Sequence, residues 1–257
     1  MPPGNKKQQS DKGIDVENKD LVKITILYDN YKHSGNTKPA WGFSCLLEGT
    51  QKTILFDTGG DADILAHNMD ALNVDVEKIQ LVVLSHNHWD HTGGLARLLE
   101  KNPAVTIYVP QSFPDDFVNR AEDSGARVVA VDQPARLCQN VYSTGEMDGP
   151  VKEQSLILKT SQGLVIVTGC SHPGILNILK HVKSHFDDKL YLVFGGFHLL
   201  QHSEAAINAI IEEFKHLGVV QCGATHCTGD LPISLFKRAY GENYIEMGTG
   251  KILNLPE

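Results

Sequence analysis

Four potential metal ligands lie within six consecutive residues of the sequence, namely His86, His88, Asp90 and His91. They follow an apolar run that ends at Leu84 and precede a pair of glycines. This order predicts a buried strand, a loop and the start of a helix. Because residues i and i+2 of an extended segment point the same way, His86 and His88 can hold one cation together. Asp90 and His91 lie beyond the expected strand, where the chain can turn them toward a second cation.

The donor atoms of this segment suit a particular class of metal. Neutral imidazoles with one carboxylate favour Zn²⁺, with Mn²⁺ or Fe²⁺ as alternatives. Zinc lowers the pKa of water from roughly 16 to about 7, so that hydroxide forms at neutral pH. We therefore expect a zinc-dependent hydrolase that acts on an ester, thioester, lactam or phosphoester. Asp90 would be the catalytic residue that orients the attacking water.

Two more histidines and one aspartate follow apolar runs and lie beside glycine-containing turns. His172 lies in Thr-Gly-Cys-Ser-His-Pro-Gly, His226 in Ala-Thr-His-Cys-Thr-Gly, and Asp57 precedes Thr-Gly-Gly. These positions suit a site built at strand ends. A histidine that only hydrogen-bonds within a loop, or an aspartate that only forms a turn, would fit the same short motifs, so the structural context must decide.

The pattern His-x-His-x-Asp-His resembles that of the metallo-β-lactamase superfamily. The motifs around Asp57, His172 and His226 are similar to others of that family, and together they extend from Leu21 to about the end of the chain. Three sequence motifs are more specific than the general superfamily pattern, namely Thr-Gly-Cys-Ser-His-Pro-Gly, Gly-Gly-Phe-His-Leu and His-Cys-Thr-Gly. They resemble the branch named for a dihydropterin ribofuranosyl-aminobenzene-phosphate synthase, many members of which are called only metal-dependent hydrolases.

The resemblance also implies roles for individual residues. Asp57 would accept a hydrogen bond from a ligand imidazole and hold that ring in the tautomer that binds metal. One or two zinc ions would be bound by six side chains: His86, His88 and His172 for the first ion, and Asp90, His91 and His226 for the second.

One position departs from the superfamily pattern. Many members carry a metal-bridging aspartate after a strand of the second half, where this chain has Gly196, which cannot bind a metal. We therefore expect one ion to be held more tightly than the other. His198 would act as a replacement ligand or as a catalytic proton donor to the leaving group. Cys170 and Cys227 adjoin the expected ligands, and although a thiolate would bind zinc strongly, we favour small buried side chains there.

Residues near these motifs could border a substrate pocket. Trp89 is bulky and lies within the metal-binding segment. Asn30, Trp41 and His198 lie in other loops that are expected to reach the same cleft. The related branch usually has a histidine near Trp41, so its substrate preference does not carry over directly.

Two other functions compete with the zinc-dependent hydrolase. A transferase resembling the synthase would join a pterin that carries a diphosphate leaving group to an aromatic ring bearing ribose phosphate, releasing diphosphate and excluding water. A non-catalytic metal-binding module is the alternative from another class. Asp90 and the six candidate ligands argue against that module, because such a set suits catalysis.

Composition narrows the partners and the compartment. The formal net charge of −8 at pH 7 argues against a nucleic-acid surface, so we expect a small-molecule substrate. No apolar stretch is long enough to span a membrane, and the N-terminal residues have no apolar core typical of a secretory signal. The five cysteines are odd in number and scattered, which favours a reducing cytoplasm over a disulfide framework. The oligomeric state is not predicted.

The strands and helices between the motifs determine where the motifs lie in the folded chain. Residues 1–20 are polar and are expected to form a flexible tail, followed by a single domain over residues 21–257. Strands and helices alternate through two similar halves, which is all that periodicity alone supports. The family resemblance implies an α+β fold, a four-layer α/β/β/α sandwich of two mixed sheets, with the metals where the strand-end loops meet.

Overall fold

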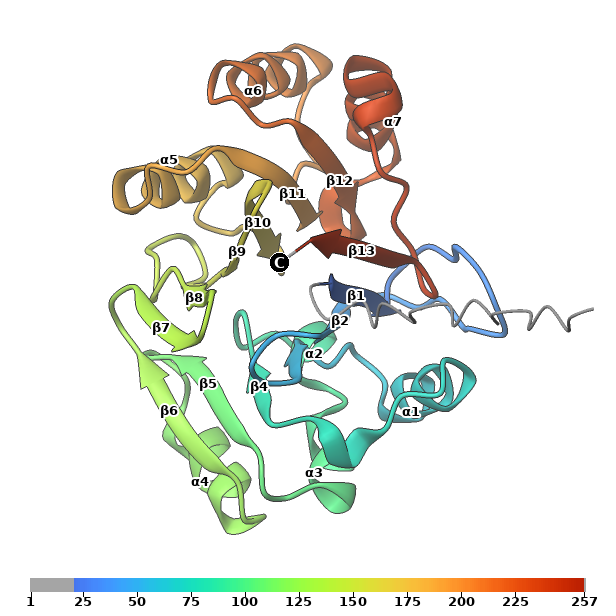
Figure 1. Ribbon diagram of the computed structural model, residues 1–257, viewed down its shortest axis with the longest axis vertical. Coiled ribbons are helices and arrows are strands. Elements are labelled where there is room, and N and C mark those ends of the chain that lie inside the picture. Colours follow the sequence, from blue (N-terminus) through green and yellow to red (C-terminus); the bar gives the residue numbers. More distant parts are fainter. Residues whose placement is uncertain (1–20, 257) are drawn as a thin grey trace, which may run out of the picture.

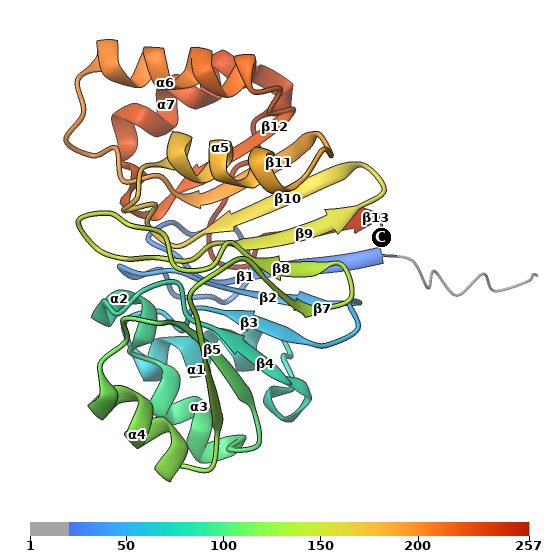
Figure 2. The same cartoon turned by 90° about the vertical axis from the view of Figure 1, so that its left-hand side faces the viewer.

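Two mixed β-sheets packed face to face form the centre of the structure, a computed structural model that describes residues 21–256. Helices cover the outer face of each sheet, so that the layers run helix, sheet, sheet, helix (Figure 1, Figure 2). This arrangement confirms the predicted α/β/β/α sandwich. The predicted flexible tail, residues 1–20, lies outside the described residues.

The first sheet has seven strands, in the order β13-β1-β2-β3-β4-β5-β6. β1 pairs antiparallel with β13 and β2, β2 pairs antiparallel with β3, and β3 to β6 run parallel. The strands are β1 (Leu21–Tyr28), β2 (Ser44–Glu48), β3 (Ile54–Phe56), β4 (Leu81–Val83), β5 (Thr106–Pro110), β6 (Arg127–Val131) and β13 (Ile252–Pro256).

The second sheet has six strands, in the order β12-β11-β10-β9-β8-β7. β10, β11 and β12 run parallel, whereas β10 to β7 pair antiparallel with their neighbours. The strands are β7 (Ala135–Cys138), β8 (Val141–Ser143), β9 (Leu156–Thr160), β10 (Gly163–Thr168), β11 (Leu190–Gly196) and β12 (Gln221–Thr225).

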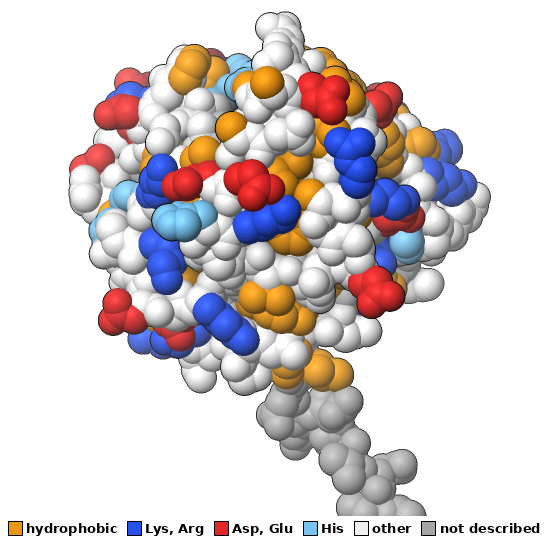
Figure 3. Space-filling view, turned by 90° about the horizontal axis from the view of Figure 1, so that it is seen from above, with side chains coloured by type: hydrophobic (Ala, Val, Ile, Leu, Met, Phe, Trp, Pro, Cys, Tyr) orange, Lys and Arg blue, Asp and Glu red, His pale blue; other side chains and the backbone are white. Residues whose placement is uncertain are grey.

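Among residues 21–256, six longer α-helices form the outer layers, and a seventh, of a single turn, lies at one edge of the sandwich. The first sheet is covered by α1 (Ala62–Ala71), α3 (Leu95–Lys101) and α4 (Asp115–Asp123), the second by α5 (Ile175–His185), α6 (Glu204–His216) and α7 (Asp230–Tyr240), and the short helix is α2 (Trp89–Thr92). On the face that Figure 3 views from above, basic and acidic side chains are interspersed. Within residues 21–256, no helix is long and apolar enough to cross a bilayer.

Apolar layers lie on both faces of each sheet, which explains the near-continuous apolar runs of the inner strands. All six residues of β10 are buried. Between the sheets, the side chains of Phe43, Phe56 and Phe194 are fully buried in one cluster, and each contributes about 1.5–3 kcal/mol of hydrophobic stabilisation. Because apolar side chains cover both faces of each sheet, a functional site has to lie at the edges of the sheets.

The direction of the strands selects the edge that carries the candidate site. β3 and β4 run parallel in the first sheet, as do β10, β11 and β12 in the second. Parallel strands end at the same edge of a sheet. Figure 2 shows α2, which follows β4, at the left edge of the sandwich, opposite the edge where β1 begins. The expected ligands therefore follow strand ends that meet at one edge of the molecule.

Gln154 joins the two sheets close to this edge, and its side chain is fully buried. Its amide nitrogen Nε2 donates to the carbonyls of Leu84, at 2.8 Å, and Tyr108, at 3.1 Å. Its Oε1 accepts a hydrogen bond from Ser143 Oγ at 2.6 Å, and its backbone N–H donates to Ser85 O at 2.9 Å. The side chain thus connects β8 with the end of β4 and with the middle of β5.

We predict that Gln154→Leu destabilises the protein while preserving its volume at this position. The Leu84 carbonyl would lose the hydrogen bond from the Gln154 side chain, and a buried polar group left unpaired costs about 1–3 kcal/mol. Urea unfolding measures the change. The exposed Gln133 provides the control, since Gln133→Leu should change stability by no more than about 0.5 kcal/mol. Equal unfolding midpoints for the two variants would contradict this role for Gln154.

Candidate metal centre

Three histidine side chains converge where β4 and β10 end. The donor nitrogens of His86, His88 and His172 lie within 4.8 Å of one another. His86 Nε2 is 3.1 Å from His88 Nδ1, and the ring of His172 lies 4.8 Å from that of His86 and 5.0 Å from that of His88. His172 Nε2 is buried and, among the described residues, has no hydrogen-bond partner. The first predicted ligand set is thus brought together, with an unpaired nitrogen that suits a metal ion.

Hydrogen bonds set the orientation of the His86 ring. Ser85 Oγ donates to Asp57 Oδ2 at 2.7 Å and is 2.9 Å from His86 Nδ1. Since its hydrogen is used on Asp57, Ser85 Oγ accepts from Nδ1, and His86 Nε2 keeps its lone pair for a metal. Burial, with His91 nearby, lowers the pKa of His86 well below its usual range, and burial, with His198 nearby, lowers the pKa of His172 to about 4. Both rings are therefore neutral, the form that binds metal.

A second cluster of four buried donors lies beside the first. It contains Asp90, His91 and His226, the second predicted ligand set, together with Cys170. Asp90 Oδ2 is 3.4 Å from His226 Nε2 and 3.7 Å from His91 Nε2. Burial alone raises the pKa of Asp90, but the interaction with His226 and the charge of His91 outweigh burial, so the pKa lies well below its usual range. The carboxylate is thus charged and available to a cation.

Asp57 holds the His91 ring from behind. Its carboxylate is fully buried, and Oδ2 accepts a hydrogen bond from His91 Nδ1 at 2.7 Å. Oδ1 accepts from the backbone N–H of Ser85 at 2.6 Å. Burial lowers the pKa of His91, but the charge and hydrogen bond of Asp57 reverse this and raise it to about 9. Because Asp57 holds Nδ1, His91 Nε2 faces the cluster.

Asn30 holds the other imidazole of this cluster. Its Oδ1 accepts hydrogen bonds from the backbone N–H of Gly42, at 3.1 Å, and from His226 Nδ1, at 3.0 Å, while its Nδ2 donates to His226 O at 3.2 Å. The Gly42 N–H can only donate, which fixes the amide orientation and leaves His226 Nε2 facing Asp90. Asn30 was expected to border a substrate pocket, but it lies behind His226 and positions that ring.

Sequence reasoning missed Glu153, which holds the loop after β10. Its side chain is buried, and its carboxylate accepts hydrogen bonds from the backbone N–H groups of Cys170, at 2.8 Å, Ser171, at 3.0 Å, and His172, at 2.7 Å. Burial raises the pKa of Glu153 although these hydrogen bonds oppose the shift. No motif singles out this acid in the sequence, because its partners lie 17 to 19 residues away.

Backbone strain is concentrated at this site. Among residues 21–256, six residues other than glycine have a positive φ, and four of them, Asp57, Ser171, His198 and His226, belong to this strand-end region. Such conformations are uncommon for residues with a Cβ and persist where the surrounding structure enforces them. The turns thus aim side chains into one small volume at some cost in stability.

The structure places Gly196 and His198 beside the donor clusters. A Cβ at Gly196 would lie 2.4 Å from the Gly169 carbonyl and 2.7 Å from Cys227 Sγ, so no carboxylate fits there. His198 is exposed and belongs to neither predicted ligand set. Its ring lies 4.4 Å from that of His172 at an angle of 52°, and its donor nitrogen lies within 4.8 Å of the Cys170 and Cys227 thiols. Cys170, rather than His198, stands among the donors of the second cluster.

Two open hollows adjoin the donor clusters. One, of about 440 Å³, has His172, Asn177, His198 and His202 among its lining residues. The other, of about 210 Å³, is lined by Trp41, His198, Leu200, Gln201, His202 and Cys227. Trp41 and His198 thus both border the smaller of these hollows. Trp89, with 64% of its surface exposed, packs against Gly60 and lines neither hollow.

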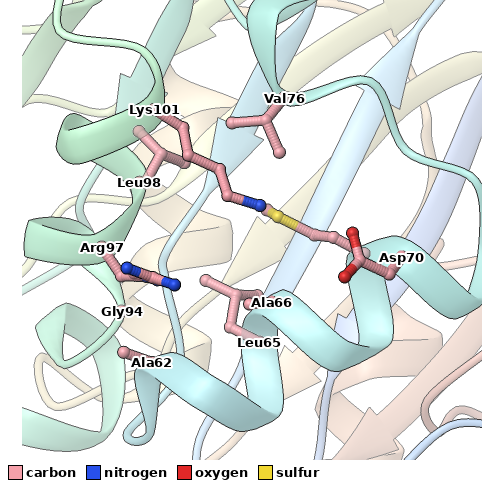
Figure 4. A pocket seen from close by; sticks show the side chains of 10 residues that line it. Ala62, Leu65, Ala66, Asp70, Val76, Gly94, Arg97, Leu98 and Lys101 are labelled. Carbon is pink, nitrogen blue, oxygen red and sulfur yellow. The ribbon is translucent and has the colours of Figure 1, made fainter.

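A further hollow lies between α1 and α3, away from the donors. Its volume is about 20 Å³, which is room for about one water molecule. Figure 4 shows Leu65 and Ala66 on one side and Leu98 and Val76 on the other, with the charged ends of Arg97 and Lys101 nearby. A space of this size and lining cannot hold a substrate.

The family model for the metallo-beta-lactamase superfamily matches residues 42–179, the stretch that contains the paired-histidine motif. The chain belongs to this superfamily. It is 32% identical, over 91% of its length and 97% of the relative, to the 7,8-dihydropterin-6-methyl-4-(beta-D-ribofuranosyl)-aminobenzene-5'-phosphate synthase of Methanocaldococcus jannaschii. These matches confirm the resemblance on which the ligand assignments were based.

Solved structures agree with this membership. Tm1679, a metal-dependent hydrolase of the beta-lactamase superfamily, superposes with a TM-score of 0.79 and 26% identity over 92% of this chain and 100% of the other. A diphosphatase from the PhnP family gives a TM-score of 0.62 and 15% identity over 92% and 99% of the two chains. At that identity the second likeness concerns the fold alone.

We predict that Asp57→Asn preserves the fold but weakens metal binding about 10–100-fold, as is typical for the hydrogen-bonding partner of a ligand. An amide has one oxygen, so it cannot accept both from the Ser85 backbone N–H at one end and from Ser85 Oγ and His91 Nδ1 at the other, and the support of the ligand rings is weakened. A competition titration with a chelating dye measures the affinity. The exposed Asp187 gives the matched control Asp187→Asn, and unchanged affinity in both variants would make Asp57 a turn residue only.

Proposed function

We propose that the protein is a metal-dependent hydrolase, with zinc as the metal, that acts on a small phosphorylated substrate. The observation that carries the proposal is the pair of adjoining donor clusters, both held from behind by buried hydrogen-bonding groups. The first consists of three neutral imidazoles and the second includes the charged Asp90. This donor chemistry fits Zn²⁺, with Mn²⁺ or Fe²⁺ as alternatives.

The substrate class follows from the hollows beside the clusters. Within the described part of the chain, no carboxylate lines either hollow, whereas Asn177, His198 and His202 supply polar groups that can donate hydrogen bonds. These surroundings favour an anionic group such as a phosphate. The name of the Methanocaldococcus relative, which specifies a 5'-phosphate product, supports the same choice.

The residues around the clusters have separable roles in this reaction. Bound metal would supply Lewis acidity, which activates water and stabilises negative charge in the transition state. Asp90 would orient the water and accept its hydrogen bond. His198, at the rim of both hollows, would donate a proton to the leaving group, and Trp41 would form the opposite wall.

A second candidate function is a transferase like the synthase. The 32% identity over nearly the whole of both chains favours it, and two adjoining hollows could hold two substrates. In that reaction a pterin would lose diphosphate as it is joined to an aromatic ring that bears ribose phosphate. A non-catalytic metal-binding module is disfavoured, because most members of the superfamily are enzymes.

Product analysis separates these functions. Purified, metal-loaded protein would be given a panel of phosphate esters and diphosphates, and separately a pterin diphosphate with and without the aminobenzene ribose phosphate. Phosphate release without a second substrate supports the hydrolase. Diphosphate release that requires the aromatic partner and yields the joined product supports the transferase. Full metal occupancy without turnover of any substrate would favour the non-catalytic module.

The compartment and partners are part of the same proposal. All five cysteines are free thiols, as a reducing compartment would leave them. We infer that the protein works in the cytoplasm on a small-molecule substrate, and that nucleic acids and membranes are not its partners.

We predict that His86→Ala or His88→Ala abolishes turnover and sharply lowers the metal content. Both rings contribute nitrogens to one cluster, so the loss should exceed the ~10–100-fold effect of removing a ligand's hydrogen-bonding partner. Metal analysis of the purified variants and the product assay above provide the measurements. His216→Ala removes a surface imidazole with 83% of its side chain exposed and should leave both quantities unchanged. Full metal content and full turnover in either first variant would refute the proposed centre.

A further inference from the structure

The thiol of Cys170 lies between the two imidazoles of the second cluster. Its Sγ is 3.2 Å from His91 Nε2 and 3.4 Å from His226 Nε2. With Asp90 included, the four donor atoms lie within 4.8 Å of one another and all four residues are buried. Four donors around one point match the tetrahedral coordination that zinc takes with nitrogen, oxygen and sulfur ligands.

The four donor atoms of this cluster face one small volume. His91 and His226 both direct Nε2 inward, because Asp57 and Asn30 accept hydrogen bonds from their Nδ1 atoms. Asp90 Oδ2 lies 3.4 Å from His226 Nε2 on the same side. A metal ion at the centre would meet all four donor atoms, which lie within 4.8 Å of one another.

The position of the thiol is linked to glycine at position 196. Gly196 N donates to the carbonyl of Gly169 at 3.1 Å, and Gly196 O accepts from Ser171 Oγ at 2.7 Å. The loop that carries Cys170 therefore lies directly against Gly196, which is why a Cβ there would collide with Gly169. A side chain at position 196 and this placement of the Cys170 loop exclude each other.

We propose that Cys170 binds the second metal ion as a thiolate, together with Asp90, His91 and His226. It thereby supplies the negatively charged ligand that Gly196 cannot. On binding, the S–H bond breaks, a sulfur–metal bond forms, and the proton is released to solvent, as is any proton on His91 Nε2. This proposal rests on the metal centre described under the proposed function.

A competing donor set shares the same thiol. Cys170, His198 and Cys227 also have donor atoms within 4.8 Å of one another. That set includes the exposed His198 and no carboxylate, and Cys227 already has a contact of its own, donating to the Cys170 carbonyl at 3.6 Å. The set with Asp90 is favoured because all four of its residues are buried and it includes a carboxylate.

Cobalt substitution tests the assignment without relying on activity. Co²⁺ bound to a thiolate has a charge-transfer absorption band in the near ultraviolet. The wild-type protein loaded with two equivalents should show this band, and Cys170→Ser should lose it and release its second equivalent to a chelator far more readily, by at least ~10-fold. Cys227→Ser and the distant Cys138→Ser should both keep the band. A band that survives in Cys170→Ser, or that disappears in Cys227→Ser, would overturn the proposal.

Zinc X-ray absorption of the wild-type protein decides the matter even where the Cys170 variant fails to fold. The proposal requires a sulfur scatterer at about 2.3 Å from zinc, and a coordination shell of nitrogen and oxygen alone would overturn it. Failure here is distinguishable from failure of the proposed function. Bound zinc without sulfur refutes only the thiolate ligand, whereas purified wild-type protein that binds no metal refutes the metal centre itself.

Discussion

The buried carboxylate of Asp57 controls the orientation of imidazoles in both donor clusters. It accepts hydrogen bonds from His91 directly and, through Ser85 Oγ, sets the ring of His86, with distances of 2.7, 2.7 and 2.9 Å along the chain. Burying such a charge costs several kcal/mol unless it is paired, so the backbone N–H of Ser85 at 2.6 Å is part of the arrangement. The centre therefore requires β3 and β4 to be parallel neighbours that end together.

The second sheet contributes a counterpart from the opposite side. Glu153 gathers three consecutive backbone N–H groups of the loop after β10, and that loop carries Cys170 and His172. Ser171, between them, has a φ of 64°, so the loop follows a strained path. Glu153 thus holds the loop that carries one residue of each donor cluster, His172 of the first and Cys170 of the second. The two sheets supply separate halves of the centre, and their face-to-face packing brings the halves together.

Much of the fold and the paired-histidine segment could be predicted because that information is local, whereas the assignment of His172 and His226 came from the family resemblance. The paired-histidine segment and the apolar runs before it lie within a few residues of each other, and buried strands of parallel sheets are apolar along their whole length. Individual elements were harder. α4 has few apolar residues, with only Ala121 buried, and β8 has only three residues, so neither shows a clear period. Neither α4 nor β8 was predicted from the sequence.

The groups that support the ligands could not be predicted from the sequence. Asn30 meets His226 across 196 positions, and Cys170 meets His91 across 79. Nothing local to Asn30 separates a residue that lines a pocket from one that lies behind a histidine. The same holds for Cys170, which as an isolated cysteine is most simply a small buried side chain. Only the packing of the two sheets reveals their partners.

The two donor clusters differ in charge, and this difference affects which bound ion an anionic substrate would approach. The first cluster consists of three imidazoles, so an ion bound there would keep its full positive charge. The second includes the Asp90 carboxylate and, with Cys170 as thiolate, would neutralise an ion's two positive charges with its own two negative ones. An anionic substrate, as proposed above, would therefore be attracted to the first ion rather than the second. The larger of the two hollows is lined in part by His172, a member of the first cluster. Under the proposed function, shape and charge thus favour the same side of the centre for the negative group of the substrate, and Asp90 would orient the water from the other side.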